Sequence, residues 1–296
     1  MLKRVVNILS RMPLSVHYAI ADYVLYPLLY HIVRYRRKMV MMNLQKSFPD
    51  LNERQRTDTC KRFYHHFADT IVRIIYGYTA TEKEMAEHIQ FQHVELLDEM
   101  TEKYGGVIAT MGHLGTWEWL LEVAKHVKTP NAKVVGVYRQ LKNKSMDELM
   151  LDIRRQRSEE VVEKNKLLRY MVANRAQKIP QMIGMLADQK PNPKYTHYWT
   201  EFLHQDTGFV DGSEQLGRKF NYPIVFFYVT SSKRGYYNVD IRLLSEHPGE
   251  EAPYSITEKY ARMLEQNIIE QPELWLWTHN RWKYNRNSYI VRKHEM

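Results

Sequence analysis

Short β-branched runs alternate with amphipathic helical patterns after about residue 90, and this alternation restricts the folds that the chain can adopt. The stretches "GGVIATM" (105–111) and "KVVGVYR" (133–139) are typical of strands, and "TWEWLLEVAKHV" between them has apolar residues at helical spacing. A strand, a helix and a strand in this order predict a βαβ unit with parallel strands. Further strands are predicted at 181–187, 223–229 and 236–244, and helices near 143–157, 164–176, 211–220 and 255–270.

The first 90 residues instead carry apolar side chains at three- and four-residue spacing, which predicts helices. Within them, residues 13–33 have Asp22 as their only formal charge and are long enough to cross a bilayer. Two histidines and a proline interrupt this stretch, and basic residues flank it on both sides. We therefore expect a helical, membrane-associated N-terminal region (1–90) followed by an α/β domain (91–296). A soluble helical hairpin packed on the core is the alternative.

Composition excludes several classes of protein. The 296 residues are 44% hydrophobic and 26% charged, which fits neither a disordered chain nor a polytopic membrane protein. The formal net charge of +9 indicates an anionic partner, which composition leaves open between nucleic acid, anionic lipid and an acidic protein. A single cysteine, Cys60, excludes an intramolecular disulfide framework and a cysteine-based zinc site. Because the chain shows no nucleotide-binding or metal motif, we expect no cofactor and no metal.

Titratable residues stand where the first predicted strand passes into a helix. His113 follows the strand by two residues, and ligands of open α/β sheets bind beyond such strand ends. Gly112 and Gly115 allow a sharp turn and let a substrate approach the backbone. On one continuous α-helix, five residues would place His113 and Glu118 on different faces. With His113 in the loop, and Thr116 capping the helix, we expect the two side chains to meet as a general-base dyad.

The spacing of this pair is not specific by itself. Histidine is followed five residues later by an acidic residue three times, at His17, His93 and His113, and only the last lies at a strand-to-helix junction with glycines. The alternative is a histidine that caps a core helix. Because no serine or cysteine is adjacent, we expect the nucleophile to be a hydroxyl of the substrate.

Five stretches resemble blocks of one protein family, in the same order along nearly the whole chain. "HLGTWEW" (113–119) resembles the His-x4-Asp/Glu block of the glycerolipid acyltransferase superfamily, and more closely that of the lauroyl/myristoyl acyltransferases of lipid A biosynthesis. The other four stretches are "RRKMVMMNLQKSFPDLNERQR" (36–56), "GVYRQLKNKSMDELMLDIRRQR" (136–157), "MLADQKP" (185–191) and "LWLWTHNRWK" (274–283). Gln140 replaces the usual proline, and residues 157–166 lack an expected glycine. The resemblance therefore leaves open which molecule accepts the acyl chain.

The resemblance implies an αβα sheet like that of the glycerolipid acyltransferases. Such enzymes transfer a fatty acyl chain from acyl carrier protein to a hydroxyl of a lipid A precursor or a related glycolipid, at the cytoplasmic face of the inner membrane. It also implies that His113 is the general base, that Glu118 is its partner, and that Arg154 belongs to the catalytic group. Arg155 and Arg157 are neighbours of Arg154, so this last assignment has alternatives, and a solvated basic face is another.

Substrate-binding residues are expected at the same sheet edge. Arg139 ends the second strand and could bind a phosphate or a thioester oxygen. Asp188 and Gln189 follow the strand at 181–187 and could order an arginine or a sugar hydroxyl, although an ordinary turn is the alternative. Gly115 would allow the substrate to come close.

Two other functions remain open on the sequence. A membrane-surface esterase or thioesterase could use the same dyad to activate water. A non-catalytic protein could bind anionic surfaces through its basic clusters. The acyltransferase is preferred, with acyl carrier protein, a glycolipid acceptor and the membrane surface as partners and without nucleic acid.

Overall fold

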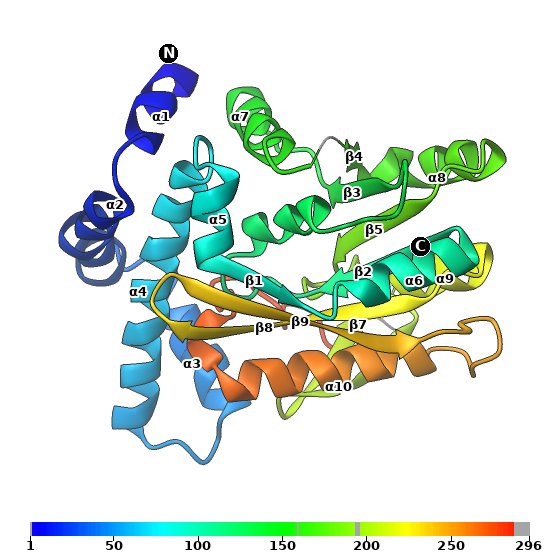
Figure 1. The fold of residues 1–296 in the computed structure, drawn as a ribbon. Coiled ribbons are helices and arrows are strands. Elements are labelled where there is room, and N and C mark those ends of the chain that lie inside the picture. Colours follow the sequence, from blue (N-terminus) through cyan, green and yellow to red (C-terminus); the bar gives the residue numbers. More distant parts are fainter. Residues whose placement is uncertain (1, 159, 193–195, 287–296) are drawn as a thin grey trace.

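The computed structural model describes residues 2–158, 160–192 and 196–286, and its centre is a seven-stranded sheet (Figure 1). The strand order across the sheet is β1-β9-β8-β2-β5-β3-β4. These strands are β1 (Ile89–Gln92), β2 (Gly106–Met111), β3 (Lys133–Tyr138), β4 (Glu160–Glu163), β5 (Gln181–Leu186), β8 (Ile224–Lys233) and β9 (Tyr236–Ser245). A separate antiparallel hairpin is formed by β6 (Tyr198–Phe202) and β7 (Gln205–Phe209).

Most neighbouring strands of the sheet are parallel. β2 pairs in parallel with β5 and β8, and β3 pairs in parallel with β5 and β4, whereas β9 runs antiparallel to β8. The predicted mixed α/β fold with a mostly parallel sheet is therefore confirmed. The two strands of the predicted βαβ unit are parallel, but they are not neighbours, because β5 lies between β2 and β3. The carboxyl ends of β2, β5 and β3 consequently meet at one edge of the sheet.

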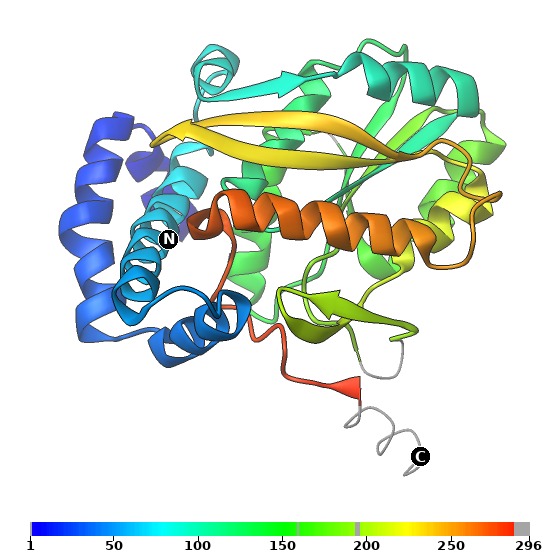
Figure 2. The same cartoon turned by 90° about the horizontal axis from the view of Figure 1, so that it is seen from below.

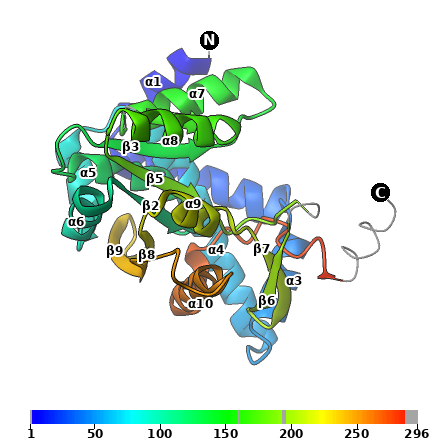
Figure 3. The same cartoon turned by 90° about the vertical axis from the view of Figure 1, so that its right-hand side faces the viewer.

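Helices cover both faces of the sheet. The α-helices are α1 (Leu2–Ser10), α2 (Leu14–Ile20), α3 (Arg37–Ser47), α4 (Glu53–Tyr76), α5 (Glu82–His88), α6 (Glu95–Tyr104), α7 (Lys144–Arg155), α8 (Leu167–Ala176), α9 (Gly212–Phe220) and α10 (Ser255–Glu270). Figure 3 shows α5 and α6 on one side of the strands and α9 and α10 on the other. In Figure 2, α10 runs alongside the β8–β9 pair.

The 3₁₀-helix η3 (Trp117–Lys125) follows β2 and lies on the face opposite α9. A Cβ on Gly136 would come within 2.8 Å of Leu121 of η3, and Gly136 is in register with Gly184 and, through it, with Ala109. The next residue of β2, Thr110, points to the other face and contacts Ser213 of α9 at 3.5 Å. Successive strand residues face opposite sides, so η3 and α9 enclose the sheet between them.

The N-terminal helices share the hydrophobic core of the sheet. Leu44 of α3 and Phe63 and Tyr64 of α4 are buried in the same cluster as Ile108 of β2. The stretch that could have crossed a bilayer is divided into α2 and two π-helical segments, η1 (Ala21–Leu25) and η2 (Pro27–Ile32). Within the described part of the chain, no helix combines the length and the apolar character that a membrane crossing needs.

The helix that closes one face, α10, is capped by a buried carboxylate from α9. Glu214 accepts hydrogen bonds from the backbone N–H of Tyr254 (2.6 Å) and from the backbone N–H (2.8 Å) and hydroxyl (2.7 Å) of Thr257. It also pairs with Arg218 at 2.8 Å. A single side chain therefore satisfies two backbone amides at the N-terminus of α10 and joins this helix to α9.

We expect Glu214→Ala to lower the free energy of unfolding by about 3 kcal/mol, because it leaves several buried donors unsatisfied and removes the carboxylate partner of Arg218. Glu250→Ala, at an exposed acidic residue, should change it by less than about 0.5 kcal/mol. Urea denaturation followed by circular dichroism measures both. Equal stability of the two variants would contradict the proposed capping role.

Candidate active site

The carboxyl ends of β2 and β5 bring His113 and Asp188 together. The Nδ1 atom of His113 lies 2.5 Å from Oδ1 of Asp188, and the backbone N–H of His113 donates to Oδ2 at 2.9 Å. Each residue stands two positions after its strand, and the two strands are paired in register. The pairing of the strands therefore positions both side chains without a long loop on either side.

Asp188 is buried, and both of its carboxylate oxygens have hydrogen-bond partners. Besides His113, its Oδ2 accepts a hydrogen bond from the indole Nε1–H of Trp275 at 2.8 Å. Burial by itself would raise the pKa of the Asp188 carboxyl, but the His113 ring and these hydrogen bonds outweigh it and lower the pKa to about 2. The carboxylate is therefore ionised at neutral pH.

This carboxylate selects the tautomer of the imidazole. An ionised carboxylate only accepts hydrogen bonds, so the neutral ring of His113 carries its proton on Nδ1. Nε2 then has a free lone pair, and the side-chain amide of Gln189, at 3.2 Å, donates to it. The side chain of His113 is 14% exposed, and Gln189 beside it is exposed. Nε2 therefore faces the accessible side of the sheet edge. This is the arrangement of a general base.

Glu118 does not pair with His113 as expected. Among the described residues, its two oxygens accept hydrogen bonds from Arg154 of α7, from Nε at 2.8 Å and from Nη2 at 2.7 Å. The reason is that neighbouring helical side chains point in different directions, about 120° apart on the 3₁₀-helix η3. Trp117 takes the face toward His113, with ring centroids 5.4 Å apart, and Glu118 is turned toward α7.

The Glu118–Arg154 pair is a bidentate ion pair with limited access to solvent. The side chains are 8% and 20% exposed. Burial lowers the pKa of Arg154, but the Glu118 carboxylate outweighs it and the pKa is raised. The basic cluster around Arg154 is not the solvated face that was the alternative. Arg157 is buried against Glu122 and the Ala80 carbonyl, and only Arg155 of the three is exposed.

The remaining predicted residues lie in different surroundings. Arg139 is exposed directly after β3, one strand away from Asp188. Gly115 is buried, with φ +58°, and a Cβ there would lie 3.0 Å from Val229 and 3.1 Å from Tyr237. The structure thus gives Gly115 a packing role in place of an open approach for substrate. Thr116 does not cap η3, and its buried hydroxyl has no hydrogen-bond partner among the described residues.

The C-terminal segment supplies a further group beside the site. His279 accepts a hydrogen bond through Nε2 from the backbone N–H of Lys190, at 3.0 Å, next to Gln189. Burial lowers the pKa of His279 to about 4, so this ring is neutral and accepts at physiological pH. Residue spacing and composition predict no catalytic role for His279 or Trp275. The resemblance of residues 274–283 to a family block was the signal that could have found them.

The first and last family-like stretches meet in space. Arg36 donates to the Thr278 carbonyl at 2.9 Å, and Asn43 of α3 donates to the Trp277 carbonyl at 3.2 Å. The N-terminal helices therefore hold the segment that carries Trp275 against Asp188. No group of three His, Cys, Asp or Glu side chains that could hold a metal ion occurs within residues 2–158, 160–192 and 196–286.

Comparison with known families identifies one match. The family model described as bacterial lipid A biosynthesis acyltransferase matches residues 4–284. The matched range includes both strand ends, the Glu118–Arg154 pair and the segment from Leu274 to Arg281. Comparison with individual curated proteins gives no match.

We expect Asp188→Asn to lower kcat by about 10³- to 10⁴-fold, because an amide disturbs the tautomer of His113 and does not stabilise its imidazolium form.

The Asp188→Asn variant should also lose a pH dependence of its free energy of unfolding. The pKa of Asp188 is lowered in the folded protein, so its contribution, about 2 kcal/mol, is present above the unfolded pKa near 4 and lost as the pH falls toward 2. Urea denaturation between pH 5 and about pH 2 compares the two proteins. Parallel pH curves would contradict the ionised carboxylate.

Proposed function

The chain belongs to the bacterial lipid A biosynthesis acyltransferases, and from this premise we propose that it moves a fatty acyl chain from acyl carrier protein to a hydroxyl of a lipid A precursor or a related glycolipid. Acyl transfer itself follows from the family, and the donor and the acceptor are our proposal. The observation that carries the chemistry is the Asp188–His113 hydrogen bond at the accessible edge of the sheet.

In the proposed reaction, Nε2 of His113 removes the proton of the acceptor hydroxyl as its oxygen attacks the thioester carbonyl carbon. The Asp188 carboxylate stabilises the imidazolium that forms. When the carbon–sulfur bond breaks, the imidazolium returns the proton to the sulfur, so His113 ends the cycle neutral. The Gln189 amide occupies the lone pair of Nε2 in the structure, so the acceptor hydroxyl replaces it on binding.

Glu118 of η3 and Arg154 of α7 support this chemistry without contacting His113. Because both oxygens of Glu118 are bound to Arg154, we assign to the pair the task of fixing the start of η3 beside Trp117, which contacts the His113 ring. Arg139 is exposed at the same sheet edge, and we propose that it binds an anionic group of the substrate.

We further propose that the N-terminal helices lie on the cytoplasmic face of the inner membrane. Apolar side chains of η1, of η2 and of the residue after η2 are exposed: Val24 by 54%, Ile32 by 72% and Val33 by 60%. Exposed cations follow immediately, at Arg34 and Lys38. Apolar side chains that end in a basic stretch fit an anionic lipid surface.

The other two functions are less well supported. The alternative prediction of a non-catalytic protein that binds anionic surfaces is wrong, because the family is one of acyltransferases. A thioesterase would use the same His113–Asp188 pair with water as the nucleophile. Only an assay with and without the acceptor separates this possibility from acyl transfer.

We expect His113→Ala to lower acyl transfer by at least about 10³-fold, since it removes the base. Arg154→Met should lower it by about 10- to 100-fold, because it releases Glu118 and the start of η3. Transfer of a labelled acyl chain from acyl carrier protein to glycolipid, followed by mass spectrometry, measures both.

Arg155→Met is the matched control for Arg154→Met, because Arg155 is adjacent and exposed, and it should keep wild-type activity. Unchanged turnover of His113→Ala would contradict the proposed mechanism. Release of free fatty acid at the same rate without glycolipid would show hydrolysis instead of transfer.

For membrane association, we expect the double variant Ile32→Glu and Val33→Glu to lower the binding to vesicles rich in anionic phospholipid by about tenfold or more. Val172→Glu, at an apolar residue of α8 that is 51% exposed, should bind like the wild type. Vesicle co-sedimentation measures all three proteins. Equal losses in both variants would show that the N-terminal helices are not the contact surface.

A further inference from the structure

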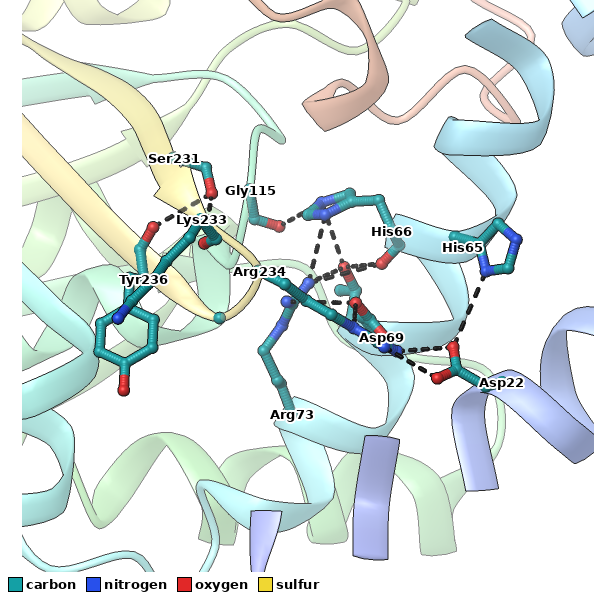
Figure 4. A network of polar contacts seen from close by, with 12 residues as sticks. Asp22, His65, His66, Asp69, Arg73, Gly115, Ser231, Lys233, Arg234 and Tyr236 are labelled. Atoms are coloured by element: carbon teal, nitrogen blue, oxygen red, sulfur yellow. Dashed lines mark hydrogen bonds and ion pairs between the residues drawn. The ribbon is translucent and has the colours of Figure 1, made fainter. Parts of the chain in front are cut away.

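The ring of His66 lies against the loop that carries His113, and it comes from a different element, α4 (Figure 4). Its Nε2 is 3.1 Å from the carbonyl oxygen of Gly115, and its Nδ1 is 3.3 Å from Nη2 of Arg73. A guanidinium only donates and a carbonyl only accepts. Both contacts therefore require the same form of His66, a neutral ring with its proton on Nε2.

The surroundings of His66 keep this ring neutral. Its enclosure and the adjacent Arg73 hold the pKa of His66 well below its ordinary value. His66 is thus unsuited to exchange protons in the reaction, but it is a permanent hydrogen-bond donor to Gly115. Thr70, whose hydroxyl donates to the His66 carbonyl at 2.9 Å, belongs to the same turn of α4.

The loop that His66 contacts is held from two sides. On one side, the Gly115 N–H donates to the Leu274 carbonyl at 3.0 Å, and the Leu276 N–H donates to the His113 carbonyl at 3.2 Å. On the other side, the Gly115 carbonyl accepts a hydrogen bond from His66. Gly115 has a positive φ, a backbone conformation that few other residues adopt. This conformation directs its carbonyl toward α4, where His66 donates a hydrogen bond to it.

Arg73, which fixes the His66 tautomer, is itself held by a chain of alternating charges. Its side chain is fully buried and lies 3.9 Å from Asp69, and Asp69 accepts from Arg234 at 2.6 Å. Arg234, in the turn between β8 and β9, also binds Asp22 of η1 at 2.7 Å. Two cations and two carboxylates therefore connect α4, this turn and the N-terminal helices (Figure 4). This neutral cluster gives the histidine a rigid support.

We propose that His66 is a positioning residue of the acyl-transfer site, which holds the Gly115 carbonyl and through it the loop that presents His113 to Asp188. The inference rests on the proposed function, since it assigns His66 to that reaction. His66 does not touch the reacting atoms. Its contribution is to keep the peptide between Gly115 and Thr116 in the one orientation that leaves the His113 ring aligned with Asp188.

The test compares His66→Gln with His66→Asn in the full chain. The glutamine amide nitrogen matches the position of Nε2 and can still donate to Gly115, whereas the asparagine amide matches Nδ1 and cannot reach it. We expect His66→Asn to lower kcat by about 10- to 100-fold with KM for the donor within about threefold, and His66→Gln to restore kcat to within about threefold of wild type. His65→Asn, at the exposed neighbouring histidine, is the matched control and should keep wild-type kcat.

A readout without activity separates this inference from the proposed function. The proton on Nδ1 of His113 should give a low-field proton NMR signal that Asp188→Asn removes. We expect this signal to shift or disappear in His66→Asn and to stay in His66→Gln, whatever the enzyme transfers. An unchanged signal in His66→Asn, or equal kcat in the two His66 variants, would overturn the positioning role. Absence of any transfer by the wild type would overturn only the proposed function.

Discussion

The Asp188 carboxylate is the contact on which the site depends. It binds the ring and the backbone of His113, at the end of β2, and the indole of Trp275, in the C-terminal segment. A buried carboxylate without these donors would be costly, so its ionised state and the position of three chain segments are established together. Removing any one donor therefore affects the other two contacts.

This arrangement explains why the N-terminal helices belong to the catalytic unit. Trp275 lies in a segment that is held on one side by the loop of His113 and on the other by Asn43 of α3 and by Arg36, the residue before α3. On the opposite side of the loop, α4 contributes His66. The helical region thus does more than contact lipid in our proposal, since it also builds the frame around His113.

Much of the fold could be predicted from local patterns. The strands at β2, β3, β5, β8 and β9 are short and β-branched or apolar, and the capping box at Asn52 is a local signal. The strand β4 and the β6–β7 hairpin were missed, because "EVVE" is polar at both ends and the hairpin has mixed polarity. The insertion of β5 between β2 and β3 depends on sheet topology, which no local pattern records.

The sequence singles out several residues that lie close together in the structure, but it does not predict which of them contact one another. His113, Asp188 and Gln189 form one cluster, and Glu118 and Arg154 form another. The expected His113–Glu118 contact assumed a loop that folds back and a helix capped by Thr116, and Thr116 does not cap η3. Trp117 takes the face toward His113, and Glu118 pairs with Arg154 of α7, a distant residue that no local pattern identifies as its partner. The roles of His66 and Trp275 require contacts between residues far apart in the sequence.

The first helix has a consequence for how the protein could be shortened. Val6 of α1 is buried against Leu149 and Ile153, and Lys3 binds Asp152 at 2.6 Å, so α1 covers the apolar side of α7. Arg154 is on that same helix. A chain trimmed at its start to remove exposed apolar residues would uncover a second apolar surface. It would also loosen the element that holds Glu118, so better solubility and retained turnover would not be obtained together.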